Sequence, residues 1–194
     1  MEMNFIEKLS NFCLGNYTFV HLPELAMTAL DEDKTSKATQ ILAGMSGDDN
    51  SFEVEQYFRK SLDELNIKLP SKLQSAQILI YYYLRKMLND QTNYFEIMTC
   101  IDNEIYGTAD WVEELKIIKR EYLGSELGLE SMYTWYRELQ DFKDGDKLFY
   151  YNNLSKEDQK SAFEKHLFEE AENLKNKIEN EVILIYQKIS TTYL

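Results

Sequence analysis

A chain of 194 residues with 44% hydrophobic and 13% aromatic side chains has enough apolar material for a sizeable core, which excludes an intrinsically disordered protein. Its formal net charge of −13 argues against a nucleic-acid binder, because phosphates would be repelled and basic residues cluster only as pairs such as Arg59-Lys60. Two prolines and seven glycines are too few for the turns of a sandwich or barrel, so the composition favours helices joined by short loops.

The first third of the chain predicts short helices with clear starts and ends. Residues 4–14 and 22–30 have helical patterns, and Pro23 suits a first turn. A third helix ends at Gly44, where a loop with a second glycine and two aspartates begins. Asn50 then has the position of an N-cap before another helix.

The middle of the chain predicts the central helix of a bundle. Ser71 and Gln74 have the spacing of a capping box. The segment 76–88 that follows is apolar on nearly every side, which is typical of a helix surrounded by neighbours. A further helix over 93–105 is closed by Gly107.

The last third of the chain predicts three more helices. Asp110 opens a helix expected to extend to Tyr122, and an aromatic helix covers 132–139. Residues 148–154 fit either an extended segment or a helical turn. Ser155 with Asp158 starts the longest helix, whose apolar positions are Phe163, Leu167, Ala171, Leu174, Ile178, Val182, Ile185 and Ile189.

These patterns together predict an all-α fold, a single-domain multi-helix bundle with a long C-terminal helix. We expect residues 1–194 to form one helical domain, and any seam to lie near Gly107, where a glycine interrupts two helical patterns. The longest apolar run, 78–84, is far too short to span a bilayer, and the acidic amino terminus does not resemble a secretory signal. We therefore expect a cytoplasmic protein with no membrane partner and with Cys13 and Cys100 as reduced thiols.

Few side chains suit a metal or catalytic site. His166 is followed by Glu169 and Glu170, but a ferritin-like di-iron site needs a Glu three residues before each His, and Phe163 stands there. The other histidine, His21, lies eight residues after Cys13 without a catalytic signature. Phosphate-loop, dinucleotide, nucleophile-elbow and zincin motifs are absent from the sequence. We predict no cofactor and no catalytic residue.

Two acidic pairs leave one enzymatic alternative open. Asp110 with Glu113, and Glu138 with Asp141, each place two carboxylates on one helix face, as in the magnesium-dependent all-α nucleotide pyrophosphohydrolases. That family begins with Glu-x-x-Glu, from which Asp110 departs. Moreover, 34 acids in 194 residues give about six such pairs by chance.

Residues 38–88 resemble the opening region of an uncharacterised bacterial all-helical family. The resemblance lies in Ile41-Leu42-Ala43-Gly44, an acidic loop, Phe52-Glu53-Val54, the segment 62–67 and Leu69-Pro70-Ser71. Some proteins of this kind accompany secreted toxins as their immunity proteins. The resemblance implies a bacterial immunity-type inhibitor and supplies no catalytic residue.

We therefore expect a non-enzymatic, acidic helical binding protein, an immunity-type inhibitor of a basic bacterial toxin. Besides the hydrolase, a helical scaffold or ligand-binding module stays open, as does the oligomeric state. A basic protein partner would be attracted to carboxylates on loops between the early helices. The predicted partner-binding residues are Asp31, Glu32, Asp33, Asp48 and Asp49.

Overall fold

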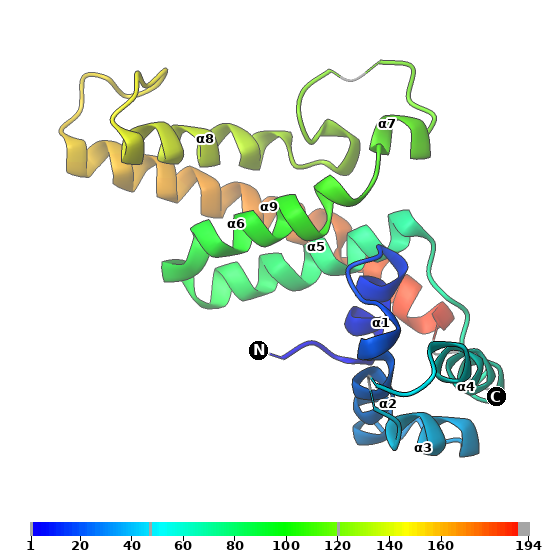
Figure 1. Ribbon diagram of the computed structural model, residues 1–194. Helices are drawn as coiled ribbons and strands as arrows, with labels where there is room; N and C mark the ends of the chain where they lie inside the picture. The colour runs from blue at the N-terminus through cyan, green and yellow to red at the C-terminus, as the bar shows by residue number, and fades with distance from the viewer. Residues whose placement is uncertain (1, 47, 120, 190–194) are drawn as a thin grey trace. The chain divides into compact units, whose positions relative to one another are not determined.

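The computed structural model describes residues 2–46, 48–119 and 121–189, and within these ranges it contains helices, turns and loops but no strand (Figure 1). The all-α prediction and the long C-terminal helix are confirmed. The chain divides into two compact units, residues 1–82 with 180–194, and residues 83–179. Gly107 lies inside the second unit, and the grouping of 1–194 into one domain stays a prediction.

The first unit contains the early helices. They are α1 (Phe5–Cys13), α2 (Leu22–Asp31), α3 (Lys37–Ala43) and α4 (Ser51–Glu64), with the 3₁₀ turn η1 (Phe19–His21) before α2. The beginning of α5 (Lys72–Asn89) and the end of α9 (Lys156–Ile189) complete this unit.

Side-chain caps define where the early helices begin. Asn4 and Glu7 form a capping box at α1, Ser36 accepts from the Thr39 N–H at α3, and Asn50 accepts from the Phe52 N–H at α4. The α3–α4 pair is also joined by a buried hydrogen bond of 2.6 Å between the Thr39 and Ser61 hydroxyls. Asn50 is the cap that the sequence predicted, and the Ser36 cap of α3 lies next to the Thr39–Ser61 contact, because the Ser36 and Thr39 hydroxyls are 2.8 Å apart.

Helix α5 is buried on nearly every side, as its apolar sequence predicts. At its start, the Gln74 N–H donates to Ser71 Oγ at 3.2 Å and the Ser71 N–H donates to Gln74 Oε1 at 2.9 Å, which confirms the capping box. Its buried apolar residues are Ala76, Ile78, Leu79, Ile80, Tyr82, Tyr83, Leu84 and Met87.

The second unit contains α6 (Tyr94–Glu104), α7 (Trp111–Glu114), α8 (Glu130–Asp144) and most of α9. In the described part of this unit, the 3₁₀ turns η2 (Gln91–Asn93), η3 (Tyr106–Thr108) and η4 (Ser125–Leu127) precede α6, α7 and α8, respectively. Every member of the apolar series predicted for the last helix is buried except Ile178, which is half-buried. With 34 residues, α9 is about 50 Å long. Among the described residues, no helix has the length and apolar character needed to cross a membrane.

The helix predicted to extend from Asp110 to Tyr122 is much shorter than expected. Lys116 has a φ of 54°, and its N–H donates to the Glu113 carbonyl while the Ile117 N–H donates to the Val112 carbonyl. This is the pair of bonds of a Schellman motif, which ends a helix with a left-handed residue. Lysine is a rare choice at that position, so the sequence carried no stop signal.

Candidate functional site

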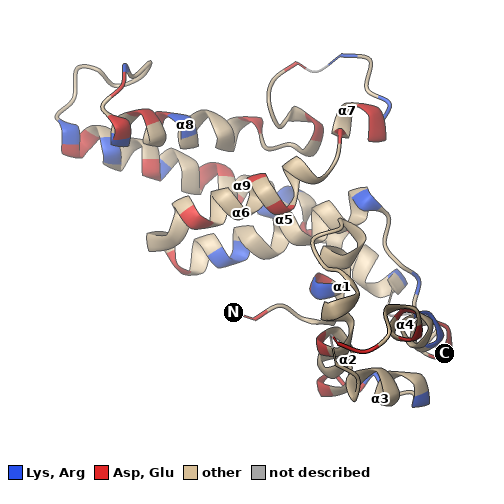
Figure 2. Ribbon diagram, in the orientation of Figure 1, with Lys and Arg blue, Asp and Glu red and all other residues tan. Residues whose placement is uncertain are grey.

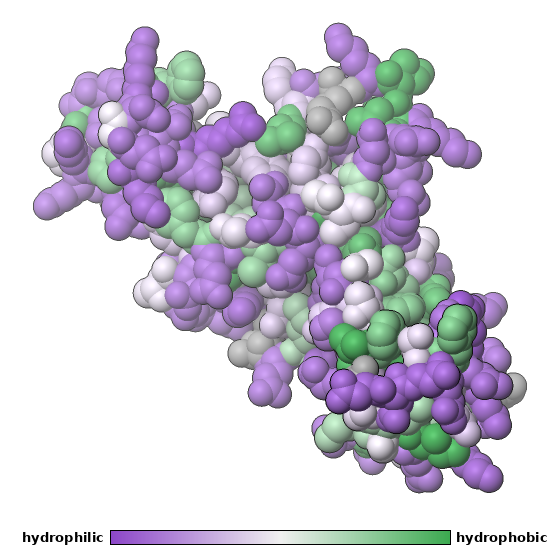
Figure 3. All heavy atoms as spheres, in the orientation of Figure 1, coloured by the Kyte–Doolittle hydropathy of each residue, from purple (hydrophilic) through white to green (hydrophobic). Residues whose placement is uncertain are grey.

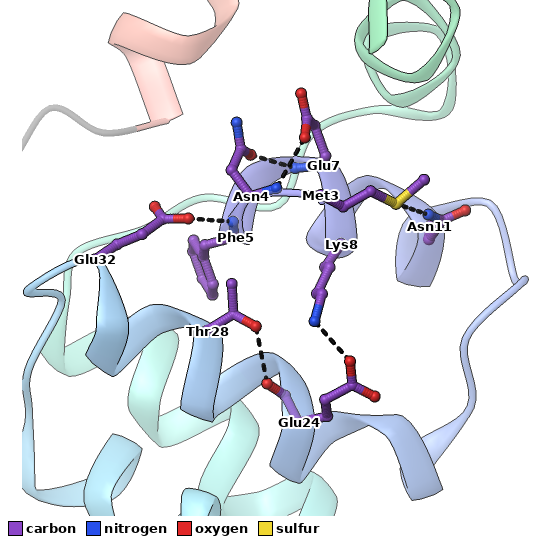
Figure 4. A network of polar contacts seen from close by, with 9 residues as sticks. All are labelled: Met3, Asn4, Phe5, Glu7, Lys8, Asn11, Glu24, Thr28 and Glu32. Carbon is purple, nitrogen blue, oxygen red and sulfur yellow. Dashed lines mark hydrogen bonds and ion pairs between the residues drawn. The ribbon is translucent and has the colours of Figure 1, made fainter. Parts of the chain in front are cut away.

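Two of the five predicted partner-binding acids are bonded to their own chain. Glu32 Oε1 accepts from the Phe5 N–H at 2.5 Å, and its other oxygen pairs with Lys34 at 2.6 Å. Figure 4 shows the Glu32 carboxylate directed at the beginning of α1. Asp49 Oδ2 accepts from the Ser46 N–H at 2.6 Å and so closes the loop before α4. These two carboxylates therefore stabilise the first unit itself.

The other three predicted acids, Asp31, Asp33 and Asp48, are exposed to solvent. Asp31 is the last residue of α2, and Asp33 follows it with a φ of 61°. Asp48 lies in the loop between α3 and α4. Figure 2 shows acidic residues on α2 and along the loop that leads into α4. These side chains are available to a partner.

Apolar side chains are exposed close in sequence to these acids. Phe52 is 83% exposed four residues after Asp48, and Met27 is 55% exposed one helical turn before Asp31. Ile41 on α3 is exposed as well, and Figure 3 shows a hydrophobic area at the surface over α3. The sequence patterns did not indicate that these side chains are exposed, because exposure of a Phe or Met depends on how the helices pack.

One carboxylate from each acidic pair of the hydrolase alternative has a structural role. Asp110 caps α7 by accepting from the N–H groups of Val112 and Glu113. Glu138 is 3% exposed and accepts from the N–H groups of Phe149 and Tyr150, at 3.1 and 3.4 Å. In the described ranges, no group of three or more His, Cys, Asp or Glu residues is arranged to hold a metal ion.

His166 is held in an aromatic cluster of the second unit. Its ring stacks on Trp135 with centroids 4.3 Å apart, and Nε2 lies 2.6 Å from the Tyr151 hydroxyl. Nδ1 lies 3.3 Å from Glu169 Oε2. Protein groups thus contact both ring nitrogens. Tyr151 has a φ of 56° and its carbonyl accepts from the Gln159 side chain, so the cluster fixes the loop before α9.

Neither His21 nor the cysteines form a nucleophilic site. His21 Nδ1 accepts from the Thr18 N–H at 3.1 Å, and its ring stacks on Tyr17. Burial raises the pKa of the Cys13 thiol to about 11. Burial also raises the pKa of Cys100. Both cysteines are free thiols, and both are protonated at neutral pH.

Comparison with family models, curated proteins and solved structures found no match. The resemblance of residues 38–88 to a bacterial helical family therefore stays a prediction.

Proposed function

We propose that this protein is a non-enzymatic acidic binding protein, and that its partner is a basic protein, such as a bacterial toxin that it inhibits as an immunity protein does. The observation that carries the proposal is the exposed carboxylates at the carboxyl end of α2. The negative end of a helix dipole lies there, and acidic side chains at that position reduce stability. Asp31 ends the helix and Asp33 follows it, so their placement costs folding energy without forming a cap.

Exposed apolar residues close in sequence to these carboxylates also support the proposal. Protein interfaces combine aromatic or methionine side chains with surrounding polar groups, and a few large side chains account for most of the affinity. Phe52 and Met27 have that character, and each lies within four residues of an exposed aspartate. We call Met27, Asp31, Asp33, Asp48 and Phe52 the acidic–apolar surface; all five belong to the first unit.

The net charge of −13 favours a basic partner over an acidic one. Complementary charge increases the association rate, and the increase falls as salt screens the attraction. A basic toxin would therefore bind fastest at low ionic strength, and the apolar side chains would then slow dissociation.

A pull-down from the native host's lysate tests the proposal. The tagged chain is washed at low and then at high salt, and the retained proteins are identified by mass spectrometry. We expect one basic protein that is retained at low salt and released at high salt. Retention of no specific protein, or of an acidic one that salt does not release, would contradict the proposal.

The magnesium-dependent hydrolase has less support, because Asp110 and Glu138 already accept hydrogen bonds from backbone N–H groups. A panel of nucleoside triphosphates with magnesium is the direct assay. Turnover that is lost in a Glu138→Gln or Glu113→Gln variant would replace the binding proposal with the enzymatic one.

A further inference from the structure

The second unit contains an open groove of about 640 Å³ between the beginning of α6 and the helices α8 and α9. This volume lies within the usual range for small-molecule sites. Three phenylalanines, Phe95, Phe142 and Phe168, and two lysines, Lys143 and Lys160, are among the residues that line it. We call it the Phe95–Phe168 groove.

The aromatic part of the groove is fixed by packing. The ring of Tyr94 contacts Phe95 at a centroid distance of 4.6 Å and meets Phe168 edge-on at 5.9 Å. The Tyr94 hydroxyl donates to Glu164 Oε1 at 3.1 Å, so the tyrosine is anchored from a second helix. Phe95 and Phe168 are only half-buried, which leaves part of each ring available to a ligand.

The charged part of the groove is positive, unlike the chain as a whole. Lys143 Nζ lies 5.1 Å from the Phe95 ring centroid, and Lys160 Nζ lies 3.5 Å from Glu164 Oε1. Because two lysines face one glutamate, the charged residues of the lining sum to plus one, against −13 for the whole chain. The same Glu164 oxygen accepts from Tyr94, so its negative charge is shared between two donors.

We propose that the Phe95–Phe168 groove binds a small planar aromatic anion. The aromatic ring of the ligand packs against Phe95 and Phe168, and its acidic group lies beside Lys143 and Lys160. Aromatic faces attract the ring, while the ammonium groups select a negative charge that the rest of the chain repels. This site is separate in sequence from the acidic–apolar surface, and it adds a ligand to the proposed protein partner.

Two fluorescent probes with related ring systems test the charge requirement. 8-Anilinonaphthalene-1-sulfonate is anionic, and N-phenyl-1-naphthylamine is its uncharged relative. We expect one saturable site for the sulfonate and weaker binding of the amine. In the Lys143→Met/Lys160→Met variant, the affinity for the sulfonate should fall about five-fold while the affinity for the amine stays within about two-fold.

A matched control separates the groove from the general field of the protein. Lys147→Met/Lys156→Met removes the same charge from two exposed lysines of the second unit that do not line the groove. It should leave sulfonate binding unchanged. Three results would overturn the proposal. They are an equal loss of sulfonate affinity in the two variants, no loss of sulfonate affinity in Lys143→Met/Lys160→Met, and no saturable binding at millimolar probe.

The aromatic contacts have their own test. Phe168→Leu keeps an apolar side chain but removes the ring, so both probes should bind about three-fold more weakly. Unfolding by denaturant identifies any loss that comes from misfolding. A folded Phe168→Leu variant that binds both probes as tightly as the wild type would contradict the assignment of the ligand's ring to this wall.

Discussion

The Glu32 carboxylate accepts a hydrogen bond of 2.5 Å from the Phe5 N–H, 27 residues away. This contact joins the end of α2 to the beginning of α1, where the helix dipole favours a negative charge (Figure 4). Glu32 therefore stabilises the fold, whereas its neighbours Asp31 and Asp33 remain exposed. Three consecutive acids thus divide into one structural residue and two that are available for binding.

This division predicts opposite effects on stability. Glu32→Gln should lower the free energy of unfolding by about 1–2 kcal/mol, because a charge-assisted hydrogen bond is weakened and the contact with Lys34 is lost. Asp31→Asn/Asp33→Asn should raise it by about 0.5 kcal/mol, because two charges leave the negative end of the α2 dipole. Urea unfolding measures both. A destabilised Asp31→Asn/Asp33→Asn variant would show that these aspartates have structural roles.

The buried Glu138 carboxylate should hold the loop that precedes α9. Glu138→Gln retains one acceptor oxygen but loses the charge, so we expect a loss of about 1–2 kcal/mol. Faster hydrogen exchange at the Phe149 and Tyr150 amides would locate the effect. Glu172 is exposed, so Glu172→Gln is the control. It should change neither the free energy of unfolding nor the exchange rates of these two amides. Unchanged exchange at both amides in Glu138→Gln would contradict this role.

Lys116 should be replaceable by glycine with a gain in stability. Its left-handed backbone is strained for a residue with a side chain, and that side chain is exposed. We expect Lys116→Gly to raise the free energy of unfolding by about 1 kcal/mol. Asn66 has a φ of 51°, a conformation that asparagine tolerates. Asn66→Gly should therefore raise the free energy of unfolding by less than Lys116→Gly does. A larger gain at Asn66 would refute the explanation.

The Cys13 thiol should make the free energy of unfolding depend on pH in the alkaline range. Its pKa rises from an ordinary value of 9.0 in the unfolded chain to about 11 in the folded one. The folded protein therefore binds the thiol proton more tightly than the unfolded chain does. The resulting contribution to the free energy of unfolding is fully present below pH 9 and is lost as the pH rises towards 11. Cys13→Ala cannot titrate. The advantage of the wild type over Cys13→Ala should shrink by about 2 kcal/mol between pH 8 and 10.5, and a constant difference would be inconsistent with a buried thiol.

Local signals in the sequence predicted most of the helices. Ser71 with Gln74, and Asn50 before α4, cap helices through atoms two or three residues away, so their roles are visible in the chain itself. Lys116 ends α7 although lysine is not a typical residue for a left-handed position, and the predicted length of that helix was wrong for this reason.

The candidate sites depend on contacts between distant residues, which local patterns do not contain. The bond from Phe5 to Glu32 removes one predicted partner residue from the exposed set. Phe95 and Phe168 lie 73 residues apart in the sequence and line one groove only after α6 and α9 have packed. The exposed Asp31, Asp33 and Asp48 were predicted as binding residues, and that role stays a prediction.

The association rate of the purified partner tests the central claim most directly. Asp31→Asn/Asp33→Asn/Asp48→Asn removes three charges from the acidic–apolar surface, whereas Glu121→Gln/Asp146→Asn/Glu172→Gln removes three exposed charges from the second unit. Both variants carry the same net charge. At low ionic strength we expect the first to bind about five-fold more slowly and the second to stay within about two-fold of the wild type. Equal rates for the two variants would contradict a docking role for this surface.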